Sequence, residues 1–335
     1  MASRIDPAWW SFEKSLSDTI EQELAKPKHR ERWKYTRSTK ALELVPNPVD
    51  HGTVSVAPGI DLDAQLVNAP EALTPFLHGQ ELTTKVMRDG ESLALEDLSG
   101  PLLINVAANA TVSITRSEVQ SSSFIWIDVQ DGAQAQISFN SLDHTALWDN
   151  LNIVIRKDAE VSLDLHHLGS PLCRQDIQVR CVASGANVTI SSAASVLPGM
   201  HLDQQVTVQH QAPNTSSQQR FHTTGSDKSK ITFNGRIHIH KDCPGVSAHL
   251  SNKNLALSDS AVINTKPELE IYTDDVACSH GATVGALASA ELFYCTSRGI
   301  TPERAKQMLS LAFLNIASTG PLSDAAIEQF KRALA

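Results

Sequence analysis

Four segments in the middle of the chain share one pattern of apolar and polar positions. They are ANATVSI (108–114), GAQAQISF (132–139), DAEVSLDL (158–165) and GANVTIS (185–191). Each begins at a tight turn and continues with apolar residues at every second position, which predicts a β-strand with one buried face. Their alanines Ala110, Ala133, Ala159 and Ala186 are about 23, 26 and 27 residues apart, a spacing typical of solenoid repeats.

Strands that return at this interval without helical segments between them favour a parallel β-helix, in which each coil covers the next. The alternation continues in KITFNGRIHIH (230–240) and ELEIYTDD (268–275). An antiparallel β-sandwich stays open as the alternative, because it also consists of short alternating strands. The pattern therefore predicts a mainly β fold.

The chain changes to a helical pattern after Gly285. Thr301 can cap a helix, and Pro302 suits the first helical position. A Gly-Pro pair at 320–321 ends this helix, and a second helix starts at Ser323. Apolar residues recur at helical spacing in the first helix, at Ala305, Met308, Leu309, Ala312, Phe313 and Ile316.

Two further leucines, Leu311 and Leu314, widen the apolar surface of the first of these helices. A single buried stripe does not need them. They either pack in the interior or belong to a docking face for a partner, and the pattern leaves both interpretations open.

The N-terminal part carries a weaker helical pattern and a basic segment. Asp6 and Pro7 can start a helix. Residues 26–40, KPKHRERWKYTRSTK, hold seven Lys or Arg against one Glu, with Trp33 and Tyr35 between them. Such a segment fits a nucleic-acid patch or a solvated helix face, and the net charge of −9 favours the second interpretation.

The overall charge narrows the classes of function. With 28 Lys and Arg against 37 Asp and Glu, the chain lacks the basic surplus that a general binder of nucleic acid or anionic membranes needs. No apolar run approaches the roughly 18–20 residues of a membrane-spanning helix, and the first residues lack the apolar core of a signal peptide. Five scattered cysteines predict no disulfide framework, so we expect a cytoplasmic protein.

The stretch DDVACSHGATVG (274–285) holds the strongest candidate site. Cys278 and His280 are two residues apart, so on a strand they face the same side. Three interpretations are open: packing at a strand end, a soft metal such as iron or zinc, and a cysteine–histidine nucleophile. A complete zinc site needs further ligands, and the sequence has no CxxC or HExxH motif to supply them.

Other motifs are weaker or absent. His238 and His240 alternate on one strand, with His249 and the pair 166–167 on other strands, and they fit a metal-binding ladder or ordinary strand histidines. The remaining cysteines have no ligand spacing. No GxxxxGK[ST] or GxGxxG occurs, so we do not expect the chain to hydrolyse a nucleotide or to be a Rossmann oxidoreductase.

Two C-terminal segments, KPELEIYTDDVACSHGATVG (266–285) and LFYCTSRGI (292–300), resemble the signature of the SufB/SufD family of iron–sulfur cluster assembly scaffolds. The resemblance covers roughly residues 200–315. Within the family, RWKYT (32–36) and APNTSS (212–217) are more similar to the SufD branch than to the SufB branch.

The resemblance implies a right-handed parallel β-helix flanked by N- and C-terminal α-helical regions. It implies that the chain pairs with SufB through the β-helix and binds the ATPase SufC through its C-terminal helices. The sequence leaves open whether the isolated chain forms a homodimer through the β-helix surface that would otherwise contact SufB. Cys278 and His280 then match a family motif that binds iron or a nascent cluster near SufB, which supplies the missing ligands. The SufC contact maps to Thr301, Pro302, Ala305, Met308, Leu309, Ala312 and Phe313.

The patterns and the resemblance divide the chain into three parts. Residues 1–80 are an N-terminal helical region with a connecting segment, 81–285 the β-helix core and 286–335 a C-terminal helical domain. We expect a scaffold for iron–sulfur cluster assembly that is not itself an enzyme and binds no nucleotide. The alternatives are a β-helical polysaccharide hydrolase or lyase and a homodimeric SufB-like scaffold.

Overall fold

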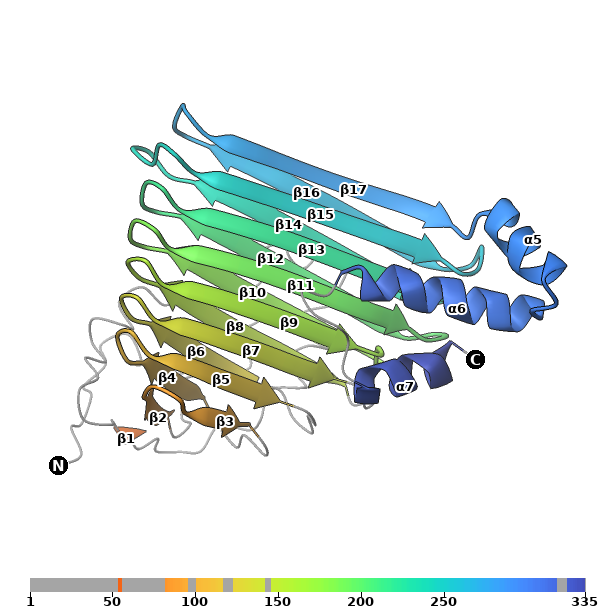
Figure 1. The fold of residues 1–335 in the computed structure, drawn as a ribbon, viewed down its shortest axis with the longest axis horizontal. Coiled ribbons are helices and arrows are strands. Elements are labelled where there is room, and N and C mark those ends of the chain that lie inside the picture. The colour runs from red at the N-terminus through yellow and green to blue at the C-terminus, as the bar shows by residue number, and fades with distance from the viewer. Residues whose placement is uncertain are drawn as a thin grey trace, which may run out of the picture.

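The computed structural model describes residues 54–55, 82–95, 101–116, 123–141, 146–317 and 324–334. Most of these residues form two β-sheets that wind into one solenoid, which confirms the predicted β-helix core (Figure 1). Every strand pair among the described residues is parallel, so the antiparallel sandwich is wrong. The predicted N-terminal helix and the basic segment 26–40 lie outside the described residues.

One sheet, which we call sheet A, has nine strands. From β2 onward its neighbouring strands are separated in sequence by a strand of the other sheet, as a solenoid requires. In spatial order they are β1 (Val54–Ser55), β2 (Leu82–Met87), β4 (Leu102–Val106), β6 (Ser123–Val129), β8 (Leu147–Ile155), β10 (Cys173–Cys181), β12 (His201–His210), β14 (Lys230–Ile239) and β16 (Val262–Ile271).

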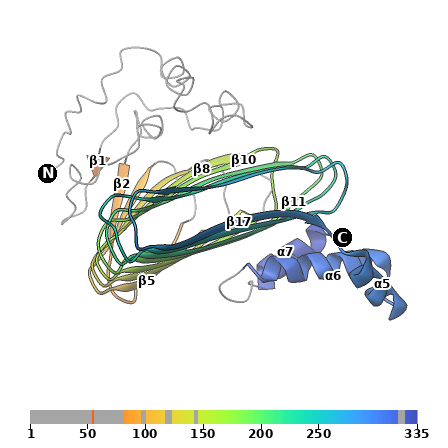
Figure 2. The same cartoon turned by 90° about the horizontal axis from the view of Figure 1, so that it is seen from above.

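The second sheet, sheet B, has eight strands and forms the opposite long side of the flattened coil (Figure 2). In spatial order they are β3 (Ser92–Ala94), β5 (Thr111–Arg116), β7 (Gln134–Ser141), β9 (Glu160–His167), β11 (Asn187–Val196), β13 (Ser216–Gly225), β15 (Ser247–Ala256) and β17 (Ala277–Ala286).

The four repeated segments occupy the same place in successive coils. They form β5, β7, β9 and β11, which are neighbours in sheet B. Val112 pairs with Ala135, Ala135 with Val161, and Val161 with Val188. The predicted repeat is therefore confirmed to the residue.

The turn from sheet A to sheet B repeats with the same backbone conformation. Gly132 and Gly185 have φ of 70° and 79°, a region that glycine enters without steric cost. A Cβ at either glycine would strike the side chain of the turn residue one coil earlier, Asn109 or Asp158. The positive-φ positions alternate along the stack as Asn109, Gly132, Asp158, Gly185, Asn214, Gly245 and Asp275.

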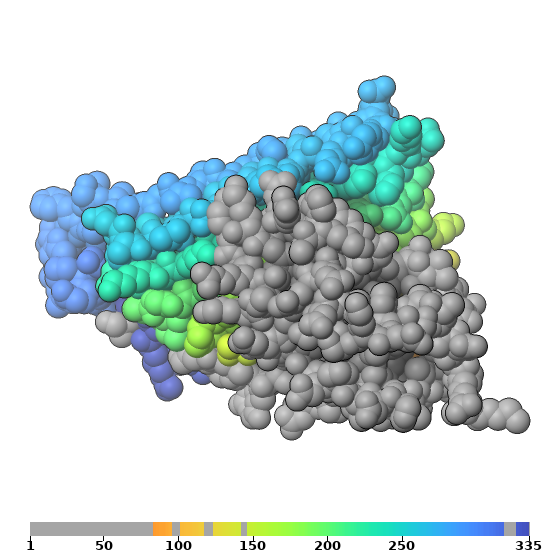
Figure 3. Space-filling view, turned by 180° about the vertical axis from the view of Figure 1, so that it is seen from behind, coloured from red at the N-terminus to blue at the C-terminus, as the bar shows by residue number. Residues whose placement is uncertain are grey.

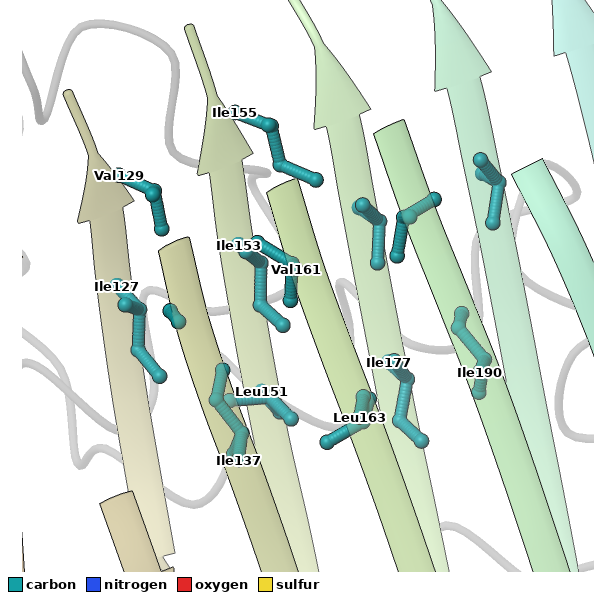
Figure 4. Packing of buried hydrophobic residues seen from close by; sticks show 14 of the residues in the cluster. Ile127, Val129, Ile137, Leu151, Ile153, Ile155, Val161, Leu163, Ile177 and Ile190 are labelled. Atoms are coloured by element: carbon teal, nitrogen blue, oxygen red, sulfur yellow. The ribbon is translucent and has the colours of Figure 1, made fainter. Parts of the chain in front are cut away.

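The interior of the solenoid is filled by branched apolar side chains from both sheets (Figure 4). Ile127 and Ile153 come from sheet A, and Ile137 and Leu163 come from sheet B. Each of these side chains is almost fully buried, and the burial of each stabilises the folded state by about 1.5–3 kcal/mol. Burial of the alternating face is what holds one coil on the next.

Three helices follow the solenoid, α5 (Ser289–Ser297), α6 (Pro302–Asn315) and α7 (Asp324–Ala333), and lie outside sheet B (Figure 2). The predicted helix after Thr301 is confirmed as α6, and the Thr301 side chain accepts a hydrogen bond from the Arg304 amide at 3.3 Å. No helix in the described ranges is long and apolar enough to span a membrane.

The two additional leucines of α6 pack in the interior. Leu314 is fully buried in a cluster with Leu168, Ala193 and Phe330, and Leu311 packs against the same cluster. For Leu314 the docking-face interpretation is wrong, because this side chain is fully buried where the helix lies on the sheet.

Candidate functional site

The last coil of the solenoid, β16 and β17, is open at its outer side. Each strand pairs with one neighbour only among the described residues, β16 with β14 and β17 with β15. Apolar side chains are exposed on this coil, with Tyr272 at 57% and Val284 at 53%. The light-blue atoms along the upper rim of Figure 3 belong to this end of the molecule. An uncovered strand edge with apolar neighbours is a surface suited to pairing with another chain.

Cys278 and His280 lie near the start of β17, at positions that face the interior of the solenoid. In the preceding coil their register partners are Ala248 and Leu250, both buried members of the core. Cys278 packs partly against that core, whereas His280 is exposed because no further coil covers it. The predicted same-side placement of the two side chains follows from this register.

The residue between them points to the opposite face and is tied to the preceding coil. The Oγ atom of Ser279 lies 2.8 Å from Nδ1 of His249 on β15. A second hydroxyl, Oγ of Ser247, lies 3.4 Å from Nε2 of the same imidazole. The Ser279–His249 contact joins β17 to β15 beside the two inward positions. The sequence did not predict a role for Ser279, because the contact depends on the strand register.

The electrostatics favour a protonated thiol at rest. Burial raises the pKa of Cys278, while a hydrogen bond with the backbone of Ala248 acts in the opposite direction. A soft metal therefore has to displace a proton from Cys278 when it binds.

The geometry disfavours a cysteine–histidine nucleophile. Side chains two residues apart on a strand start about 6.6 Å from each other, and the described structure contains no hydrogen bond between Cys278 and His280. A metal ion can bridge such a gap, but no three His, Cys, Asp or Glu side chains in the described ranges are arranged to hold one. The described structure therefore places Cys278 and His280 on one face without a complete set of metal ligands around them.

The other predicted histidines lie elsewhere. The rings of His238, on strand β14 of sheet A, and His240, just after it, stack at 4.2 Å between centroids. Nδ1 of His238 is 3.6 Å from Glu270, and Nε2 of His240 is 3.3 Å from Gln209. His240 is thus hydrogen-bonded and His238 lies beside a carboxylate, which fits ordinary strand histidines, the second of the two interpretations.

The helical region has a second exposed surface. No residue of α5 is buried, and Phe293 and Tyr294 are 73% and 59% exposed. Of the residues predicted on α6, Met308 is 43% exposed. Thr301, Pro302 and Ala312 are also exposed, Leu309 is half-buried, Ala305 is fully buried, and Phe313 stacks on His222.

The chain matches the family model described as the SUF system FeS cluster assembly SufBD core domain over residues 94–313, about two thirds of its length. It is 33% identical over 174 residues to the iron–sulfur cluster assembly protein SufD of Escherichia coli, covering 52% of this chain and 41% of that protein. A SufBD family protein of Synechocystis is 30% identical over 234 residues, covering 63% and 51%.

Similarity to SufB is lower. The iron–sulfur cluster assembly protein SufB of Bacillus subtilis is 28% identical over 148 residues, covering 44% of this chain and 32% of that protein. In these three comparisons the matched part spans about half or less of the relative's length. The family match, by contrast, spans nearly all strands of the solenoid and most of α6. The chain belongs to the SufB/SufD family of iron–sulfur cluster assembly proteins.

Proposed function

We propose that the chain is a SufD-type scaffold subunit that supports iron acquisition and cluster assembly at an interface with SufB. The observation that carries this proposal is the open last coil, which combines free strand edges with an inward-facing thiol and imidazole. The iron or nascent cluster is cargo that must later be released. Two ligands alone bind such cargo weakly enough for transfer, and a partner subunit would supply the remaining ligands.

The edges of β16 and β17 support docking of SufB. Each strand is ten residues long and can hydrogen-bond an added strand along its free edge. Docking there would also cover the exposed apolar side chains Val262, Tyr272 and Val284. Cys278 and His280 would then lie at the junction of the two subunits.

The exposed surface of α5 and α6 supports docking of SufC. Phe293, Tyr294 and Met308 are aromatic or polarisable side chains of the kind that anchor protein interfaces. Ala305 and Phe313, which the sequence resemblance assigned to this contact, face the protein itself and act through packing. SufC would supply the ATP-driven work that a chain without a P-loop cannot perform.

Co-expression with SufB and SufC tests the proposal. The His280→Ala variant should form a complex of unchanged mass but contain less iron and acid-labile sulfide. Thr283→Ala is the matched control, because Thr283 lies on the same strand and faces outward. Wild-type iron and sulfide in the His280→Ala complex would contradict the site assignment.

A second copy of the chain can use the same free edges, since an isologous contact needs only one self-complementary surface. Mass measurement of the chain alone and mixed with SufB separates the two arrangements. A homodimer that persists in the presence of SufB would favour a SufB-like scaffold. Turnover of a polyuronate by the isolated chain would favour the hydrolase or lyase, and the cytoplasmic location stays a prediction.

A further inference from the structure

The end of α6 and part of α7 pack on the solenoid. Leu314 near the end of α6 and Phe330 of α7 pack on Leu168 and Ala193 of the solenoid. Helix α5, which has no buried residue, extends away from the sheet (Figure 2). With 14 residues α6 is about 21 Å long, and Leu311, Phe313 and Leu314 near its C-terminal end belong to or pack against the cluster on the solenoid.

One polar contact accompanies this apolar packing. His222 lies on the outer face of β13, between the inward-facing Phe221 and Thr223. Its Nδ1 donates a hydrogen bond to the backbone carbonyl of Phe313 at 2.7 Å, and its ring stacks on the Phe313 ring with centroids 4.6 Å apart. The carbonyl can only accept, so the proton resides on Nδ1.

The bonded carbonyl is one of the last four of α6, which have no partner within the helix. His222 therefore caps the helix from a strand 91 residues away in sequence. Burial lowers the pKa of His222, so the ring stays neutral near pH 7. Apolar packing is non-directional and lets a helix slide or roll, whereas this hydrogen bond fixes its position along the strand.

We propose that His222 is a positioning residue that couples α6 to the solenoid, so that a displacement of the helices reaches the last coil. The inference rests on the proposed function, in which an ATPase docks on α5 and α6. His222 pairs with Lys253 on the neighbouring strand β15, and Lys253 pairs with Thr283 on β17. Thr283 is three residues from His280. These strands are joined by continuous backbone hydrogen bonds, which makes the sheet stiff in this direction.

Two substitutions separate the hydrogen bond from the ring. His222→Phe keeps a ring to stack on Phe313 but removes the donor, and His222→Asn keeps an N–H near the position of Nδ1. Gln218→Ala, on the same face of β13, is the matched control. Each variant is co-expressed with SufB and SufC, and complex mass, ATP hydrolysis, iron and acid-labile sulfide are measured.

In the His222→Phe complex, mass and ATP hydrolysis should match the wild type while cluster content falls about fivefold or more, the lower end of common coupling strengths. His222→Asn should restore cluster content to within about twofold of the wild type. A purely structural role would instead lower complex yield and cluster content together. Wild-type cluster content in His222→Phe, or an equal loss in His222→Asn, would overturn the proposal.

Hydrogen exchange of the isolated full-length chain tests whether His222 holds the end of α6 on the solenoid, even if a variant complex assembles poorly. Amides at the end of α6 should exchange faster in His222→Phe than in Gln218→Ala, and unchanged exchange would overturn the proposal. If the wild-type chain fails to bind the ATPase, the proposed function fails and the transmission role with it. The exchange result then still reports on the anchor alone, so the two failures are distinguishable.

Discussion

The middle coils of the solenoid and its last coil are built from the same repeat but differ in what covers them. In the middle coils, inward residues such as Ile153 and Leu163 have a coil on both sides and are completely buried. In the last coil the equivalent inward positions of β17 hold Cys278, His280 and Val284, which are partly or largely exposed. The same strand geometry that buries apolar side chains in the middle coils therefore leaves a thiol and an imidazole partly or fully uncovered in the last coil.

The comparison indicates how a repeat fold can carry a transient site. A middle coil must satisfy packing on every side, so a weakly held ligand has no room there. The last coil is free of that constraint on its outer side, and under the proposed function its cysteine and histidine are completed as ligands by a partner. Changes in the middle should therefore alter stability, and changes at the end should alter binding.

The largest expected effect is the removal of a buried charge. Inside the solenoid, Arg116 forms an ion pair with Asp149, and both contact Ser123. Asp149→Ala would leave a buried guanidinium unpaired, which typically costs about 3–5 kcal/mol. Chemical denaturation followed by circular dichroism measures the loss.

The control for this change is an exposed ion pair in the last coils. Glu268 lies 3.4 Å from Arg236, whose side chain is 41% exposed. Glu268→Ala should cost no more than about 1 kcal/mol, because water screens the charges. Equal losses in the two variants would contradict the contrast between the coils.

A smaller effect comes from a pair of apolar truncations. Leu163→Ala leaves a cavity in the middle of the core and should destabilise the protein by about 2–5 kcal/mol. Val284→Ala removes methyl groups that already contact water, and it should cost less than about 1 kcal/mol. If Val284→Ala proved as costly as Leu163→Ala in the isolated chain, the last coil would be covered in solution.

The middle coils were predictable from sequence because neighbouring coils of the same chain bury their inward residues. The alternation of Val112, Ala135, Val161 and Val188 records burial by neighbouring coils, and the structure confirms it in register. The position of α6 followed from Thr301 and Pro302, since capping is a local interaction. Alternation alone left the antiparallel sandwich open, because period two does not encode strand direction.

The last coil was less predictable because its environment depends on what docks there. Cys278 and His280 were identified with their shared face, but the sequence pattern did not show that Tyr272 and Val284 would be exposed. The burial of Ala305 and the stacking of Phe313 on His222 were also missed, because helical spacing does not say which side of a wide apolar face meets the protein.

Two buried histidines should make the stability of the protein depend on pH. Burial lowers the pKa of His167 to about 3 and that of His210 to about 4, and both lie on the inner side of the coils. Below about pH 6.5 the unfolded chain binds protons that the folded chain cannot, so stability is full above that pH and falls by up to about 1.4 kcal/mol per pH unit for each histidine. Denaturation midpoints from pH 8 to pH 4.5 measure it.

His167→Leu should flatten this pH dependence, since it removes one of the groups that titrate on unfolding. A profile that stays as steep as that of the wild type would show that His167 is already protonated or accessible in the folded protein.

The smallest effect on stability, and the sharpest on binding, is expected at Cys278. Cys278→Ala should change the free energy of unfolding by less than about 1 kcal/mol, because its side chain is only partly buried. The thiol must lose its proton to bind a soft metal, and burial raises its pKa. Cobalt(II) affinity of the complex with SufB should therefore rise by up to about tenfold per pH unit between pH 6.5 and 8.5. The thiolate-to-cobalt absorption measures this affinity. Cys278→Ala should remove its pH dependence. His280→Ala should lower the affinity but leave the pH dependence in place. A wild-type affinity that does not change with pH would mean that this thiol is not a ligand, and the open coil would then be a docking surface alone.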